Sequence, residues 1–152
     1  MINIRPATNA DAEEIKTLVF SVLREYGLTP DSSTTDKDLD AIEETYFQRG
    51  GYFGVVVDDN RIIASVGLCP ESDSTCELRK MYCLPAGRGK GLGKQLLEFS
   101  LAKARELGFS RITLETASAL KEAIGLYQQY GFVPFSPEHL SARCDQAFEL
   151  YL

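Results

Sequence analysis

The spacing of apolar and polar side chains changes several times along the chain, and each change marks a predicted element. Near residue 8 the spacing becomes helical, because Thr8 and Asp11 are placed as in a capping box and apolar side chains then recur every three or four residues. The face of this first helix that is predicted to be buried carries Ile15, Leu18, Val19, Val22 and Tyr26. Gly27 follows as the expected C-terminal cap.

Three further segments have helical spacing, and seven have the apolar, β-branched or alternating pattern of strands. The predicted helices cover residues 39–46, 92–107 and 119–130, and the polar residues 28–37 are interpreted as a mobile loop. The predicted strands are 2–5, 52–57, 61–68, 75–84, 110–116, 132–135 and 147–152. Residues 58–60 read as the turn of a hairpin, so the first four strands are expected to form an antiparallel half-sheet. The strand, helix and strand from 75 to 116 predict a parallel pair.

Residues 84–94 read L-P-A-G-R-G-K-G-L-G-K and connect a strand pattern to a helix pattern. Glycines admit backbone conformations closed to other residues, and the free N–H groups of a helix start attract anions, so this turn is a candidate phosphate site. Between residues 78 and 97 there are five basic side chains and no acidic one, although the chain has a net charge of −6. This local excess favours an anionic ligand, while a solvated basic surface is the alternative.

The spacing of the glycines and basic residues decides which known phosphate-binding loop this segment resembles. The dinucleotide pattern G-x-G-x-x-G fails, because Lys94 stands where the third glycine should follow Gly89 and Gly91. The nucleoside-triphosphate pattern G-x-x-x-x-G-K-[ST] fails at Arg88 and Gln95. What remains is Arg88-x-x-Gly91-x-Gly93, which resembles the pyrophosphate loop of the GNAT superfamily of acetyl-CoA-dependent N-acetyltransferases.

The resemblance extends over essentially the whole chain and is strongest from residue 77 to 135. There E-L-R-K-M-Y-C-L-P-A-G-R-G-K-G-L-G-K-Q-L-L, I-T-L-E-T and A-I-G-L-Y-Q-Q-Y-G-F follow one another in the order of the family's motifs. It implies an α/β (α+β) GNAT fold, with a mixed sheet of about six to seven strands, a V-shaped splay between strands 4 and 5, and about four flanking helices.

The resemblance also implies where acetyl-CoA is bound. A bulge in the fourth strand would free the backbone of Met81, Tyr82 and Cys83 to pair with the pantetheine arm and to polarise the thioester. The cofactor's pyrophosphate would lie on the loop residues Arg88, Gly89, Lys90, Gly91, Leu92, Gly93 and Lys94. Lys90 and Lys94 could instead lie in solvent. Many members carry an asparagine where this chain has Leu120, which puts one cofactor hydrogen bond in doubt.

Three side chains are candidates for the chemistry. Glu115 ends a strand twelve residues before Tyr127, as in members that resemble ribosomal-protein N-terminal acetyltransferases, and Glu77 lies where other members carry a base. Either carboxylate could instead pair with Arg79 or another basic side chain. Tyr127 matches the family's general acid, and its transfer of a proton to a thiolate would cost only roughly 2 kcal/mol at ordinary pKa values. Tyr127 could alternatively belong to the core stripe of its helix.

Composition narrows the remaining choices. The chain has 152 residues, which suits one N-acetyltransferase domain over residues 1–152. We expect a cytoplasmic protein without a membrane partner, because no apolar run approaches the length of a membrane span. His139 is the only histidine and the four cysteines form no C-x-x-C pair, so we expect buried thiols and no metal. The acidic charge argues against nucleic acid as a partner.

Two functions therefore stand after sequence analysis. The first is an acyltransferase that moves acetyl from acetyl-CoA, its cosubstrate, to a primary amine of a small molecule or protein by direct attack in a ternary complex. The second is a GNAT-like module that binds or senses acyl-CoA without turnover. The acceptor is expected to be selected by residues 28–51 and 136–146, which carry no readable motif. An acidic patch in the first of these segments could favour a cationic amine or could be a solvated face. A monomer and a homodimer both remain open.

Overall fold

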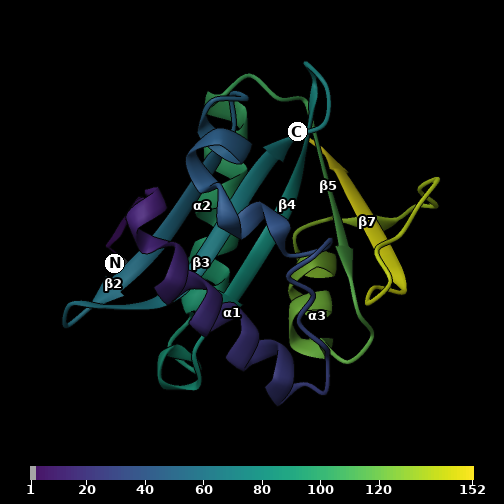
Figure 1. Cartoon of the computed structure of the whole chain (residues 1–152). Helices are drawn as coiled ribbons and strands as arrows, with labels where there is room; N and C mark the ends of the chain where they lie inside the picture. Colours follow the sequence, from purple (N-terminus) through teal and green to yellow (C-terminus); the bar gives the residue numbers. More distant parts are fainter. Residues whose placement is uncertain (1–2) are drawn as a thin grey trace.

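The computed structural model describes residues 3–152, which form a seven-stranded mixed sheet covered by helices on both faces (Figure 1). The strands lie in the order β1-β2-β3-β4-β5-β7-β6. The strands are β1 (Ile4–Pro6), β2 (Tyr52–Asp58), β3 (Arg61–Pro70), β4 (Thr75–Cys83), β5 (Arg111–Thr116), β6 (Val133–Pro134) and β7 (Gln146–Tyr151). The helices are α1 (Ala12–Glu25), α2 (Leu92–Glu106) and α3 (Lys121–Gln129), and short helical turns lie at Asn9–Asp11, Lys37–Asp40, Glu43–Phe47 and Pro85–Gly87. The predicted fold class is confirmed.

Two hydrophobic cores lie on the two faces of the sheet. The helix α1 and the helical turns between residues 37 and 47 cover one face, with Ile15, Leu23 and Tyr46 fully buried. The helices α2 and α3 cover the other face, where Leu96 and Leu97 are buried against the strands. The helical periodicity of the sequence therefore identified most of the buried positions, but on α1 it missed Leu23 and included Tyr26, which is only partly buried.

The antiparallel half-sheet β1–β4 is confirmed. Asp59 and Asn60 adopt positive φ angles of 52° and 61°, as a tight hairpin turn between β2 and β3 requires. The capping box is also present: Thr8 accepts from the N–H of Ala10, and Asp11 accepts from the N–H of Thr8. Part of the first predicted strand, residue 2, lies outside the described residues.

A bulge interrupts β4 opposite β3. Ser65 pairs with Tyr82 and Gly67 pairs with Arg79, so two residues of β4, Lys80 and Met81, stand opposite the single residue between them on β3. Lys80 has a φ of 55°, in the left-handed region. The bulge shifts the alternation by one residue: the side chains of β4 that pack on the α2 and α3 core come from positions 76, 78, 81 and 83.

The predicted parallel pair forms only at the start of its two strands. β4 and β5 are paired from Thr75–Arg111 to Glu77–Thr113, and their ladder ends there. On its other edge, β5 is paired antiparallel with β7 along its whole length, from Arg111 to Thr116. The second half of β4 therefore has no ladder partner on its β5 side in the described part of the chain, and the strands diverge (Figure 1).

Two details of the sequence prediction need correction. The pattern over residues 39–46 does not form an α-helix, because the backbone leaves helical geometry at Ala41, with φ −147° and ψ 66°, and divides the segment into a 3-10 turn and a π turn. The loop over 28–37, interpreted as mobile, is anchored near its end, where Asp36 is only 1% exposed and forms ion pairs with Lys80 and Arg143.

Candidate active site

Two cavities open where β4 and β5 diverge, and they meet at β4. The smaller, of about 260 Å³, runs along the bulged half of β4 to the loop that precedes α2. The larger, of about 760 Å³, lies between the sheet, residues 34–45 and residues 139–144. Both are lined by Met81, Tyr82, Leu120 and Ala123. A ligand in one cavity therefore borders a ligand in the other at the centre of the bulged strand.

The smaller cavity contains most of the predicted cofactor site. Its lining includes Met81, Tyr82, Cys83, Arg88, Gly89, Gly91, Leu92 and Gly93. Lys90 and Lys94 are exposed and lie outside this lining. Gly91 precedes α2 with φ 75° and no side-chain cap, so the N–H groups of the first helical turn remain available to an anion.

Arg88 is folded back beneath this loop. Its guanidinium donates to the carbonyl of Cys83, at 3.1 Å from Nε and 2.9 Å from Nη2, and forms an ion pair with Glu25 of α1. It also lies 5.4 Å from the centre of the Tyr26 ring. The side chain of Arg88 thus braces the end of β4 against α1, and it already occupies one backbone acceptor that the sequence analysis assigned to the cofactor.

The basic character of residues 78–97 is weaker than the sequence suggested. Arg79 pairs with Glu77, Lys80 with two aspartates and Arg88 with Glu25. Among residues 3–152, only Lys90 and Lys94 of the five basic side chains have no ion pair. An anion at this loop would therefore be contacted mainly by the backbone of the loop and the start of α2.

The larger cavity brings together all three candidates for the chemistry. Glu77 on β4, Glu115 on β5 and Tyr127 on α3 line it. Glu115 accepts a hydrogen bond from the N–H of Ser141, at 2.8 Å, which ties β5 to the loop before β7. Residues from both segments that were expected to select the acceptor also line this cavity, including Thr34, Asp38, Leu140 and Arg143.

Tyr127 is both a core residue and a cavity residue. It is 6% exposed, and its ring packs against Phe132 and Phe148 at centroid distances of 5.7 and 6.5 Å. Burial raises the pKa of Tyr127 well above the usual phenol range, so its hydroxyl stays protonated and can serve as a donor. Burial likewise raises the pKa of the neighbouring Tyr82 to about 12.

Glu77 is a carboxylate in two opposing environments. Burial raises its pKa and the nearby charge of Glu115 adds to this, whereas the charge and hydrogen bond of Arg79 lower it, and the net result is a raised pKa. The ion pair with Arg79 that sequence analysis named as the alternative role of Glu77 is present. A raised pKa moves this carboxylate toward the range in which a general base works.

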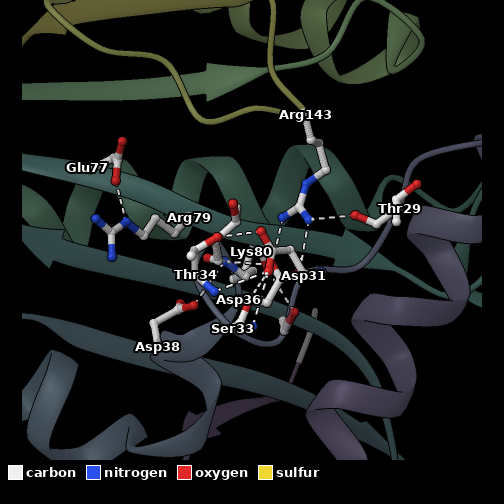
Figure 2. A network of polar contacts seen from close by, with 12 residues as sticks. Thr29, Asp31, Ser33, Thr34, Asp36, Asp38, Glu77, Arg79, Lys80 and Arg143 are labelled. Carbon is white, nitrogen blue, oxygen red and sulfur yellow. Dashed lines mark hydrogen bonds and ion pairs between the residues drawn. The ribbon is translucent and has the colours of Figure 1, made fainter.

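A buried ionic network lies beside the bulge and was not foreseen from the sequence (Figure 2). Lys80 reaches Asp36 at 3.4 Å and Asp38 at 3.1 Å, and Arg143 contacts Asp36 with both Nη atoms at 2.9 and 2.6 Å. The exposed fractions of the four side chains are 6% for Lys80, 0% for Asp36, 6% for Asp38 and 11% for Arg143. Asp38 Oδ1 contacts Lys80 as an ion pair and makes no further hydrogen bond within residues 3–152.

This network joins three parts of the site. Asp36 belongs to the segment before the 3-10 turn, Lys80 is the left-handed residue of the bulge, and Arg143 belongs to the loop that covers Glu115. Burial alone would raise the pKa of Asp36, but the hydrogen bonds from Arg143 and from the N–H of Asp31, with the charge of Lys80, hold it below the usual range. The network therefore fixes the positions of the bulge and of both walls of the larger cavity relative to one another.

The part of the chain from residue 3 onward contains no group of three His, Cys, Asp or Glu side chains placed to hold a metal ion. All four cysteines are free thiols, and Cys69 and Cys76 are buried. Within the same residues, no helix has the length and apolar character needed to span a membrane.

The fold and the cavities define an α/β protein in which two joined cavities lie at an opening in the sheet. The model of the acetyltransferase (GNAT) family matches residues 19–132, and the chain belongs to this family. It is 44% identical over 135 residues to the uncharacterised N-acetyltransferase YjgM of Escherichia coli, covering 85% of this chain and 80% of that protein. It is 30% identical over 101 residues to human N-acetyltransferase 8B, covering 62% and 44% of the two chains.

Solved structures share the fold. A GNAT-family acetyltransferase of Staphylococcus aureus superposes with a TM-score of 0.91 at 23% identity, over 99% of both chains. The acetyltransferase yncA of Salmonella typhimurium, solved with acetyl-CoA, gives a TM-score of 0.76 at 21% identity, over 99% of this chain and 93% of that one.

Proposed function

We propose that residues 1–152 form one N-acetyltransferase domain, which transfers the acetyl group of acetyl-CoA to a primary amine by direct attack in a ternary complex. The observation that carries the proposal is the shared wall of the two cavities at Met81, Tyr82, Leu120 and Ala123. One ligand lying along the loop and β4 and another lying in the larger cavity would meet there without a covalent enzyme intermediate. The solved acetyl-CoA complex of yncA, which shares this fold, supports the choice of cosubstrate.

The cofactor is proposed to enter from the loop. The N–H groups at the start of α2, with Gly89, Gly91 and Gly93 as an open backbone surface, would hold the pyrophosphate. The pantetheine arm would run along Met81 to Cys83 as an added strand, because β4 has no β5 partner there among the described residues. An N–H of this segment would polarise the thioester carbonyl.

The amine must lose a proton before or during attack. A lysine-type amine has a pKa near 10.4, so only roughly one molecule in a few thousand is neutral at pH 7. Glu77 and Glu115 both line the acceptor cavity. We assign the base to this pair, with Glu77 favoured by its raised pKa and Glu115 by its place at the end of β5.

Tyr127 is proposed to stabilise the leaving thiolate as a hydrogen-bond donor. Because burial raises its pKa, complete transfer of its proton to sulfur costs more than it would for an ordinary phenol. Donation of a hydrogen bond is the better-supported role, since it stabilises the developing charge without requiring full transfer. The proton that protonates the thiolate would then come from the amine nitrogen through the carboxylate pair or water.

The test measures free thiol released from acetyl-CoA in the presence of a panel of amines, with calorimetry of acetyl-CoA binding alongside. The proposal predicts thiol release that depends on one or more amines and on the protein. Tight acetyl-CoA binding with no thiol release for any amine would support the non-catalytic acyl-CoA-binding module instead. Absence of acetyl-CoA binding would reject both.

A further inference from the structure

The larger cavity is lined by four carboxylate side chains and four Lys or Arg side chains, and most of them are already ion-paired, either with one another or with a charge just outside the lining. The lining carboxylates are Asp38, Asp40, Glu77 and Glu115, and the lining basic side chains are Lys37, Arg79, Lys80 and Arg143. Asp38 pairs with Lys80, Asp40 pairs with Lys16, and Arg143 is held by Asp36. Such a balance does not favour a ligand that is only cationic.

Arg79 differs from Lys80 and Arg143, the other cations inside the cavity, because part of its hydrogen-bonding capacity is unused. Its Nε donates to Glu77, but its two Nη groups make no hydrogen bond to any side chain or carbonyl in residues 3–152. The side chain is 35% exposed and faces the cavity, and Figure 2 shows its guanidinium turned away from the network around Lys80. Lys37, by contrast, lies exposed at the rim.

The bulge explains why Arg79 points here. Leu78 and Met81 both pack on the α2 and α3 core, so the two residues between them, Arg79 and Lys80, turn to the opposite face. Lys80 is then used to anchor the strand to Asp36 and Asp38. Arg79 is left with a planar pair of free donors beside Glu77.

Carboxylate acceptors are also left over at the same place. Glu77 and Glu115 each use one oxygen, Glu77 toward Arg79 and Glu115 toward the N–H of Ser141, and the second oxygen of each has no partner within residues 3–152. The cavity thus presents a guanidinium fork that suits a carboxylate and two carboxylate oxygens that suit an ammonium group.

We propose that the acceptor is an amine that also carries a carboxylate, an amino acid or a close analogue, with Arg79 as the residue that binds its carboxylate. The inference rests on the proposed function. The acceptor's carboxylate would take the two Nη donors, and its amine would lie toward Glu77, Glu115 and the wall shared with the cofactor cavity. Arg79 is therefore a specificity residue, and the carboxylates act on the amine.

The experiment compares α-amino acids with their carboxamides, which keep the side chain and amine but lose the negative charge. Acetyl transfer is followed as thiol release, and binding of the same compounds to CoA-loaded protein is followed by calorimetry. We expect kcat/KM to favour the acid over the amide by roughly 10- to 100-fold, the size of a lost charge-assisted contact. The amide has the less basic amine, so its larger neutral fraction works against this preference.

Two variants test whether Arg79 recognises the carboxylate of the acceptor or only balances the charge of Glu77. Arg79→Lys keeps a positive partner for Glu77 but loses the bidentate fork, so the ratio of kcat/KM for the acid to kcat/KM for the amide should fall to below about threefold. Arg49→Gln is the matched control, because that exposed arginine donates to Cys69 and Pro70 and does not line the cavity. It should leave the preference unchanged.

The outcomes are distinct for the two proposals. Equal use of acids and amides, or an unchanged preference in Arg79→Lys, would overturn the assignment of Arg79 while leaving N-acetyl transfer intact. No thiol release for any compound, with acid-selective binding that Arg79→Lys abolishes, would refute the enzyme and uphold the carboxylate site. Neither transfer nor selective binding would refute both.

Discussion

Replacing Asp36 with asparagine should destabilise the protein far more than replacing a surface aspartate of the same segment. The side chain is fully buried and shared by Lys80 and Arg143. Asparagine keeps its shape but removes the charge, which leaves both cations without their common counter-ion in a site that is almost fully buried.

The expected loss follows from the geometry. Breaking a buried ion pair costs about 3–5 kcal/mol. Lys80 keeps Asp38 and Arg143 keeps its hydrogen bond to the carbonyl of Thr29, so the lower end, about 3 kcal/mol, applies here. For a chain of this length that lowers the melting temperature by roughly 6–12 °C.

The assay is urea unfolding at pH 7 followed by circular dichroism, with linear extrapolation to water. Asp40→Asn is the matched control: Asp40 pairs with Lys16 but is 49% exposed, so its loss should cost under about 1 kcal/mol. Added salt should leave the effect of Asp36→Asn in place, because a buried pair is screened little. Equal, small losses for the two variants would refute the view that this network supports the site.

Three further predictions concern the titration of the network, the loop and the base. The pKa of Asp36 in the folded protein lies below its usual value of 3.8, so its contribution to stability is complete above pH 3.8 and is lost as pH falls through the folded pKa. The free energies of unfolding of wild type and Asp36→Asn should therefore converge in acid. A constant difference between them from pH 7 to pH 2 would contradict this. Gly91→Ala places a side chain at φ 75°, at a cost of about 1–2 kcal/mol, and should weaken acetyl-CoA binding by roughly tenfold in calorimetry, whereas Gly125→Ala, where nothing lies within 4 Å, should not. If Glu77 is the base, the slope of log(kcat/KM) against pH should decrease by one as pH rises through a pKa above 4.5, and Glu77→Gln should not show this change of slope. A change of slope that persists in the variant would belong to another group.

Much of the architecture was predictable because it depends on local pattern. The alternation from residue 52 to 84 specified the antiparallel strands, and the helical spacing after Gly91 specified the face of α2 that becomes buried. The loop could be classified because its glycines and Arg88 keep a fixed spacing. In each case the information lies within one short segment, and the structure adds only its placement.

The ionic network could not be predicted in this way. Asp36 and Arg143 are 107 residues apart, and each appears in the sequence as one more charge in a polar loop. The family resemblance implied a bulge in this strand, but the pattern did not show that Lys80 takes the left-handed conformation, since it lies in an uninterrupted strand pattern and no glycine marks its positive φ. The direction of Arg79, and with it the character of the acceptor cavity, follows from that one shifted residue.

The most direct test of the central claim, that acetyl transfer takes place where the two cavities meet beside Tyr127, is steady-state kinetics of Tyr127→Phe. The variant keeps the ring contacts with Phe132 and Phe148 and removes only the hydroxyl. The account predicts unchanged acetyl-CoA affinity with a kcat lowered by about 100-fold, as for loss of a positioned proton donor. An unchanged kcat would contradict it.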